Sequence, residues 1–150
     1  MSKYFVYFSA TGNGDFVAEQ LTPRGYEAVK VEMVKPMGKI GFFKILNYGF
    51  RAMTNKKEEI KPIEQQIGEE DKVIIGSPVW NDRLSTPINT VLSQLKLNKE
   101  TTQFVLYPAG NKTKKAVKQL KKMGFAKEPV VVPNPLKYND QARILLERIR

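Results

Sequence analysis

Short apolar runs alternate with amphipathic stretches along this chain, and that alternation constrains its fold more than any other feature. The first run, "KYFVYFS" at residues 3–9, is almost continuously apolar, which is typical of a strand covered on both faces. We predict strands at residues 3–9, 27–34, 72–78, 102–111 and 129–135, the fourth of them running into a glycine-containing loop. We predict helices at residues 12–21, 84–95, 112–124 and 139–150. This alternation indicates an α/β protein with a doubly wound parallel sheet and helices on both faces.

Several of the predicted helices have residues at their ends that start or stop a helix. Ser85 is a candidate N-cap, and Pro87 lies in the first turn behind it. The sequence "TPRG" at residues 22–25 stops the first helix, and Gly124 closes the lysine-rich one. Asp140 is a candidate cap or first-turn charge for the last helix.

The stretch from residue 35 to residue 62 is longer than a plain crossover between strands. Its apolar residues predict an amphipathic helix, and the polar "TNKKEEIKP" at its end predicts a surface loop. The apolar residues are Ile40, Phe43, Ile45, Leu46, Phe50 and Met53. The 150 residues contain no internal repeat, low-complexity tract or linker. We therefore expect one domain over residues 1–150, with an insertion at about 35–62.

The residue types that the chain lacks exclude several kinds of chemistry. With no Cys and no His, disulfides, thiolate nucleophiles, zinc sites and imidazole acid/base catalysis are excluded. Difficult chemistry would have to come from carboxylates, Lys, Tyr, hydroxyls or a bound cofactor. No apolar run approaches the roughly 20 residues that span a bilayer, so we expect a soluble, cytoplasmic protein with no membrane partner.

The charge of the chain is strongly positive. There are 25 Lys and Arg residues against 15 Asp and Glu residues, a net charge of +10, which attracts anionic partners. The predicted helix "KTKKAVKQLKKMG" carries five of these lysines on one broad face: Lys114, Lys115, Lys118, Lys121 and Lys122. A solvated helix face is the simplest interpretation. A nucleic-acid-binding module is an alternative, although no base-stacking aromatic residues are interleaved with the lysines.

The stretch "FSATGNGDF" at residues 8–16 has the features of a phosphate-binding loop. It leaves a predicted strand and opens a predicted helix, where unpaired backbone N–H groups and the positive end of the helix dipole suit an anion. Gly12 and Gly14 let the backbone approach a ligand closely, and Ser9 and Thr11 supply hydroxyl groups.

Three other interpretations of this loop are weaker. A nucleoside-triphosphate loop is absent, because no Gly-Lys-Ser/Thr follows. A dinucleotide fingerprint is incomplete because Val17 takes the place of its third Gly, although Glu32 lies twenty residues after Gly12 near the end of the second strand. The third possibility is a ligand-free turn, since Ser, Thr, Gly and Asn are common wherever a strand turns into a helix.

The sequence "SATGNG" resembles the S/T-x-T-G-N-T phosphate loop of the flavodoxin family. The resemblance implies that this loop holds the single phosphate of FMN through hydroxyls and amides, with no Arg or Lys. The implied residues are Ser9, Ala10, Thr11, Gly12, Asn13 and Gly14. Gly14 departs from the family pattern, which has a hydroxyl at that position. The resemblance also implies a five-stranded sheet in the order 2-1-3-4-5. Response regulators share this order, but the acidic residues that they need are absent from "FSATG" and "IIGSP".

Two further loops extend the resemblance, because each follows a predicted strand at the edge where ligands bind in such sheets. In "GSPVWNDRLSTP", the resemblance implies flavin contacts from Ser77, Pro78, Val79, Trp80 and Asn81, with Trp80 beside the isoalloxazine ring. In "YPAGNKT", it implies contacts to the polar edge of the ring from Pro108, Ala109, Gly110 and Asn111. The third loop offers no second stacking aromatic residue, although Tyr107 is close in sequence.

The function that the resemblance implies is electron transfer between protein partners by bound FMN, which needs neither a catalytic side chain nor a metal. The alternative is an FMN-dependent NAD(P)H oxidoreductase that acts on quinones or other small acceptors, with the 35–62 insertion as one wall of its pocket. The basic surface predicts a redox partner with an acidic docking face. The aromatic residues Phe42, Phe43, Tyr48 and Phe50 exceed what one helix stripe buries, so both a monomer and a homodimer are open.

Overall fold

The computed structural model describes residues 1–35 and 57–149, and it contains a parallel sheet flanked by helices. The parallel strands are β1 (Lys3–Tyr7), β2 (Glu27–Lys30), β3 (Lys72–Trp80), β5 (Gln103–Tyr107) and β6 (Val130–Val131). They are arranged in the order β2-β1-β3-β5-β6. When only these five parallel strands are counted along the chain, this is the predicted order 2-1-3-4-5, which is therefore confirmed. A sixth strand that was not predicted, β4 (Arg83–Leu84), pairs antiparallel with the end of β3.

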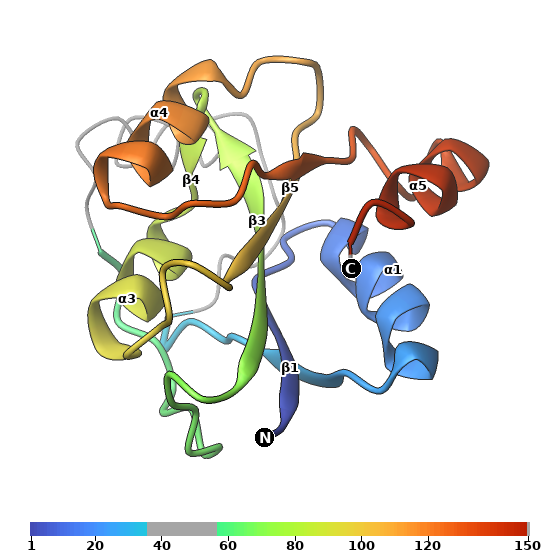
Figure 1. Ribbon diagram of the computed structural model, residues 1–150. Helices are drawn as coiled ribbons and strands as arrows, with labels where there is room; N and C mark the ends of the chain where they lie inside the picture. The colour runs from blue at the N-terminus through green and yellow to red at the C-terminus, as the bar shows by residue number, and fades with distance from the viewer. Residues whose placement is uncertain (36–56, 150) are drawn as a thin grey trace.

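The helices cover both faces of the sheet, as Figure 1 shows. On one face lie α1 (Asn13–Leu21) and α5 (Asn139–Leu146), and on the other lie α3 (Thr86–Gln94) and α4 (Lys114–Lys122). The helix predicted within residues 35–62, with its aromatic residues, falls almost entirely on residues 36–56, outside the described part of the chain. Each described α-helix lies within the range that its apolar spacing predicts, and the last one ends at Leu146 rather than at residue 150. A short 3-10 helix, η1 (Thr22–Arg24), forms in the predicted stop signal after α1.

The core is divided by the sheet into two apolar layers, because neighbouring strand residues point to opposite faces. In β1, Phe5 and Tyr7 pack with α1 and α5, whereas Val6 packs with α3 and α4. The same alternation recurs in β3, where Ile74 faces one layer and Ile75 the other. All five residues are at most 5% exposed. Burying a side chain of this size stabilises a fold by roughly 1.5–3 kcal/mol, so β1 and β3 hold both layers together.

Helix ends follow the predicted signals with one change. Gly25 and Gly124 have φ of 92° and 95°, the left-handed conformation that lets a helix stop and the chain turn away. Asp140 lies in the first turn of α5, as expected. Ser85 occupies the N-cap position of α3, but its hydroxyl caps no backbone amide. That hydroxyl instead lies 2.9 Å from the hydroxyl of Ser77, inside the protein.

The predicted loop "GSPVWNDRLSTP" is largely a β-hairpin, which corrects the prediction. Strand β3 continues to Trp80, and the chain reverses at Asn81 and Asp82, whose φ values are 50° and 63°. A positive φ at both central residues belongs to the tight turn that best joins twisted antiparallel strands, and Asn and Asp tolerate it. Pro78 fits inside this strand because its nitrogen points toward the side of β3 where β1 has already ended.

The other strands are shorter than predicted. The strand predicted at residues 27–34 ends at Lys30, and the one predicted at residues 129–135 spans only Val130–Val131. Both are edge strands, so each pairs with only one neighbouring strand. An edge strand therefore ends where its backbone diverges from that one neighbour. Within the described residues, no helix combines the length and apolar character that crossing a bilayer requires.

We expect Gly76→Ala to destabilise the protein, because β3 passes too close to β1 at this point for a side chain. A Cβ at Gly76 would lie 2.6 Å from the ring of Phe5 and 3.0 Å from Cβ of Tyr7. Overpacking of this kind costs about 1–3 kcal/mol of unfolding free energy, measurable by urea denaturation of the flavin-free protein. The control is Gly110→Ala, where a Cβ meets nothing within 4 Å. Equal stability of the two variants would contradict the packing argument.

Candidate functional site

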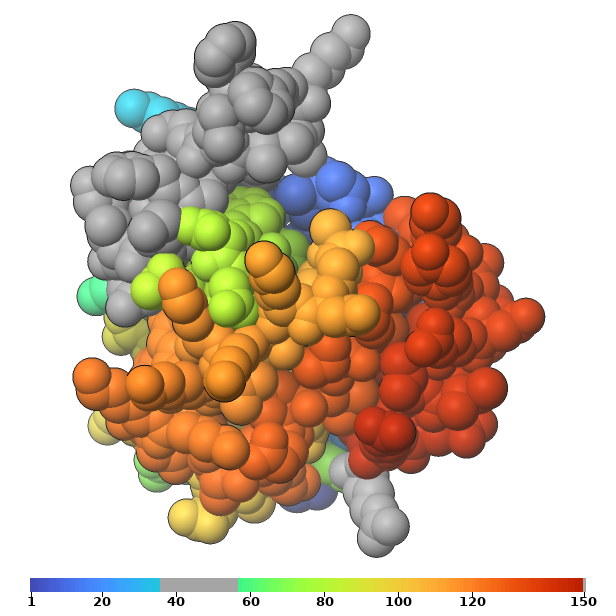
Figure 2. Space-filling view, turned by 90° about the horizontal axis from the view of Figure 1, so that it is seen from above, coloured from blue at the N-terminus to red at the C-terminus, as the bar shows by residue number. Residues whose placement is uncertain are grey.

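The carboxyl ends of β1, β3 and β5 lie at one edge of the sheet and carry the three predicted binding loops to the same place. This edge faces the viewer in Figure 2, where the blue loop after β1, the green hairpin after β3 and the orange segment after β5 gather near one another. Red residues after β6 complete the group. Open α/β sheets bind ligands outside the carboxyl ends of their strands, at the point where strand order reverses.

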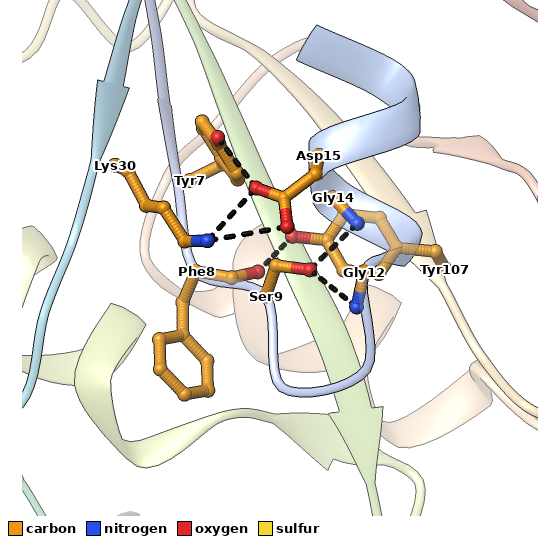
Figure 3. Close-up of polar contacts among 8 residues, drawn as sticks. All are labelled: Tyr7, Phe8, Ser9, Gly12, Gly14, Asp15, Lys30 and Tyr107. Carbon is orange, nitrogen blue, oxygen red and sulfur yellow. Dashed lines mark hydrogen bonds and ion pairs between the residues drawn. The ribbon is translucent and has the colours of Figure 1, made fainter. Parts of the chain in front are cut away.

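The loop after β1 is organised around the hydroxyl of Ser9. Its Oγ accepts hydrogen bonds from the backbone N–H of Gly12 at 3.1 Å and of Gly14 at 3.0 Å (Figure 3). Gly12 has φ of 94°, which brings the chain round to start α1. No described residue accepts a hydrogen bond from the N–H of Thr11, Asn13 or Asp15. The loop therefore presents unused donors at a helix N-terminus, which is the arrangement that binds a phosphate.

Close packing around residue 14 explains why this chain has Gly there, where the flavodoxin pattern has a hydroxyl-bearing residue. A Cβ at this position would lie 2.6 Å from the hydroxyl oxygen of Tyr107, 2.7 Å from the ring of Tyr7 and 2.9 Å from Cβ of Ser9. Distances this short leave no room for any side chain. The hydroxyl that flavodoxins place here cannot fit because the Tyr107 hydroxyl already occupies the space beneath the loop (Figure 3).

Two buried phenols form the floor under the loop. The hydroxyl of Tyr107 donates to the carbonyl of Phe8, and the hydroxyl of Tyr7 donates to Oδ1 of Asp15 at 2.8 Å. Burial raises the pKa of Tyr107 well above its ordinary value. Burial, followed by the hydrogen bond to Asp15, also raises the pKa of Tyr7. Both phenols are therefore protonated donors near neutral pH, and they hold the end of β1 and the start of α1 in place.

The negative charge of Asp15 is balanced within the site. This residue lies in the first turn of α1, where its carboxylate would repel a bound phosphate. Nζ of Lys30, from the end of β2, lies 3.0 Å from Asp15 Oδ1 and 3.1 Å from Oδ2 (Figure 3). Together with the hydrogen bond from Tyr7, this ion pair compensates the carboxylate beside the loop.

Residues 134–138, after β6, also lie at the site, although they are not among the predicted binding residues. The N–H of Leu136 donates to Oδ1 of Asn13 at 3.2 Å, which attaches this segment to the phosphate loop. Asn134 donates its backbone N–H to the carbonyl of Pro108 at 3.1 Å and its side-chain amide to the carbonyl of Ala109. The Asn-Pro pair at 134–135 marks a turn in the sequence, but only the sheet order places that turn beside β1 and β5.

The hairpin after β3 places its predicted residues in two different settings. Ser77 is fully buried, and its hydroxyl lies within hydrogen-bonding distance of Ser85 Oγ and accepts from the Ser85 N–H at 3.1 Å. Its side chain therefore closes the base of the hairpin instead of facing a ligand. Pro78, Val79 and Trp80 are half-buried, and Asn81 is exposed at the turn. The Trp80 ring packs edge-on against Phe8, with centroids 5.6 Å apart.

The loop after β5 is exposed at its tip. Pro108 is buried, whereas Ala109, Gly110 and Asn111 are exposed beside the phosphate loop and hairpin. Tyr107 is 2% exposed and bonded to Phe8, so it cannot serve as a second stacking aromatic residue. The three predicted loops thus come together, and the assignment of their individual residues to flavin contacts stays a prediction.

Fold and loop chemistry together define a flavodoxin-like flavoprotein. The loop at residues 9–14 offers donors for one phosphate and no Lys or Arg to bind more, which suits a mononucleotide. The chain belongs to the NADPH-dependent FMN reductase family, whose model matches residues 8–142. FMN is the flavin of this family and of this chain.

Solved structures with the same fold span nearly the whole chain. A flavoprotein from Bacteroides eggerthii is 22% identical with a TM-score of 0.70, over 99% of this chain and 98% of that chain. A flavoprotein from Lactobacillus acidophilus, solved in complex with FMN, is 18% identical with a TM-score of 0.65, over 94% of this chain and 98% of that chain. No curated protein matches the chain. The flavodoxin resemblance is thus confirmed for fold and flavin, and the family is that of the FMN reductases.

We expect Thr11→Val to weaken the binding of FMN by about tenfold, because it removes an exposed hydroxyl that is predicted to bond the charged phosphate. Riboflavin, which has no phosphate, should bind both forms equally. Flavin fluorescence quenching measures both affinities. The control is Thr101→Val, an exposed threonine two residues before the start of β5, at the opposite edge of the sheet. Equal losses for the two flavins would show that Thr11 does not contact the phosphate.

The two buried phenols should make the protein less stable at alkaline pH. Because folding raises their pKa values, phenols of the unfolded chain lose their protons first as the pH rises above about 10. The stability that these phenols contribute is therefore complete below about pH 10 and is lost as the pH rises further.

We expect the free energy of unfolding to fall more gently with pH in Tyr107→Phe than in the unchanged protein, measured by urea denaturation from about pH 9 to 11. Tyr138→Phe, which alters an exposed phenol, is the control and should keep the original slope. Identical slopes for all three proteins would refute the role assigned to Tyr107.

Proposed function

We propose that this protein is an NAD(P)H-dependent oxidoreductase that uses bound FMN to pass electrons from a nicotinamide dinucleotide to a quinone or another small acceptor. The observation that carries the proposal is the match of the NADPH-dependent FMN reductase family over residues 8–142. This match supports the oxidoreductase over the protein-to-protein electron carrier that the loop motifs first suggested.

In this proposal, the residues of the phosphate loop and of the two neighbouring loops each contribute to binding FMN. The free N–H groups of Thr11, Asn13 and Asp15 and the hydroxyl of Thr11 would bind the phosphate. Ser9 would keep the loop in its binding shape, since its hydroxyl already organises two of the loop amides. The hairpin with Trp80 and the loop at residues 109–111 would border the ring of the flavin.

The chemistry requires little from the protein beyond position and electrostatics. Bound FMN supplies the capacity to accept a hydride from a nicotinamide and to release two electrons to an acceptor. Such a transfer needs no imidazole or thiol, which agrees with a chain that has no His and no Cys. The net charge of +10 raises the local concentration of an anionic dinucleotide and speeds its encounter with the protein.

The direct test is to mix the FMN-loaded protein with NADPH in the absence of oxygen and follow the visible absorbance of the flavin. We expect rapid bleaching without any added reductase, and reoxidation when a quinone is supplied. Free FMN mixed with NADPH at the same concentrations is the control for uncatalysed reduction.

A flavin that stays oxidised with both NADPH and NADH, yet is bleached once a separate flavodoxin reductase is added, would contradict the oxidoreductase. That result would instead favour the electron carrier.

A further inference from the structure

A groove of about 750 Å³ lies between α3 and α4. These two helices cover the face of the sheet away from α1 and α5 (Figure 1). Helix α3 contributes Asn89, Leu92 and Ser93 to its lining. From α4 and the residue after it come Lys115, Lys118, Gln119, Lys122 and Met123, and Lys57 and Arg83 complete the lining. The volume is within the range of about 300–1,000 Å³ that small-molecule sites occupy.

The described residues of the lining carry five positive charges and no negative one. The cations are Lys57, Arg83, Lys115, Lys118 and Lys122, and none of them forms a side-chain ion pair with another described residue. In contrast, Lys121 on the outer side of the same helix pairs with Glu128 at 3.0 Å. Two described acidic residues lie beside the groove: Asp82, whose Oδ1 accepts the backbone N–H of Lys115 at 3.3 Å, and Glu58, which follows Lys57 and whose backbone bonds Thr90 of α3. Unpaired cations around one hollow repel one another, and an anion in the hollow relieves that repulsion.

The walls also provide hydrogen-bonding groups and apolar surface. Nε2 of Gln119 donates to Oδ1 of Asn89 at 3.2 Å and joins the two helices across the groove. Nη1 of Arg83 is buried without a hydrogen-bond partner among the described residues, so this guanidinium has unused donor capacity. Leu92 and Met123 offer apolar surface that a base can contact. A phosphorylated nucleotide, with anionic, polar and flat apolar parts, matches this mixture.

The groove begins next to the predicted flavin ring. Arg83 is paired with Trp80 across the β3–β4 hairpin. Residues directly opposite in such a pair lie only about 4.5–5.5 Å apart at their Cα atoms. One hairpin therefore carries the aromatic residue predicted beside the flavin and the first cation of the groove.

We propose that this groove binds the adenosine 2′-phosphate end of NADPH while the nicotinamide reaches the flavin past the hairpin; in this form the inference rests on the proposed function. The groove would then be the element that distinguishes NADPH from NADH. Its concave shape favours a small ligand over the broad, flat contact that a protein partner makes. The lysines have no interleaved aromatic residues on which the bases of a nucleic acid stack.

The experiment measures binding of adenosine 2′,5′-bisphosphate to the FMN-loaded protein by calorimetry, so it does not depend on turnover. We expect Lys115→Gln/Lys118→Gln to weaken binding by about tenfold. The matched control is Lys114→Gln/Lys121→Gln, which removes the same charge from the same helix but changes two lysines that do not line the groove. It should change the affinity by less than about twofold, because exposed pairs contribute little.

Kinetics separate this inference from the proposed function. If NADPH reduces the flavin, the groove variant should raise the KM for NADPH by about tenfold, leave the KM for NADH unchanged and leave kcat intact. Equal effects of the two double variants would contradict the assignment of the groove as a nucleotide site. Failure of adenosine 2′,5′-bisphosphate to bind the unchanged protein would contradict it as well. A protein that binds this nucleotide in the groove but never oxidises NADPH would refute the proposed function and leave the phosphate site standing.

Discussion

The candidate site depends on the close approach of the Gly14 backbone to the hydroxyl of Tyr107. That hydroxyl leaves no space for a side chain at residue 14, and it bonds the carbonyl of Phe8 at the end of β1. Strand β5 therefore supports the loop from below, while Ser9 gathers the amides of Gly12 and Gly14 from within. Because these internal contacts organise the loop before any ligand arrives, its free amides need little further ordering to bind a phosphate.

Charge is distributed so that this pre-formed loop can accept an anion. Asp15 is the acidic residue in the first turn of α1, and Lys30 and Tyr7 both bind its carboxylate. On the other side of the sheet, the cations of the α3–α4 groove have no such partners among the described residues. At the phosphate loop, the charge of Asp15 is compensated, and the helix dipole suffices to attract an anion. In the groove, the positive charges are left uncompensated, which suits the more highly charged ligand proposed there.

Much of this arrangement could be predicted from the sequence, because apolar periodicity determines which residues face a core. The strand order, the helices on both faces and the convergence of three loops followed from that pattern and from family resemblance. The tight turn at Asn81 and Asp82 was missed because "GSPVW" contains Pro and Gly, which usually mark loops but here lie inside a strand that continues to Trp80 after it has lost one neighbour. The packing role of Gly14 and the contact of Leu136 with Asn13 could not be predicted, because they join residues far apart in the chain.

The central claim is that the loop at residues 9–14 holds the phosphate of FMN through its free backbone amides. The most direct measurement is the change in the backbone amide NMR signals when the ¹⁵N-labelled protein is titrated with FMN and, separately, with riboflavin. We expect large shifts at Thr11, Asn13 and Asp15 with FMN and small ones with riboflavin, while residues of the hairpin and of the loop after β5 shift with both. Amides of residues 11–15 that respond equally to the two flavins, or that respond to neither, would contradict the account.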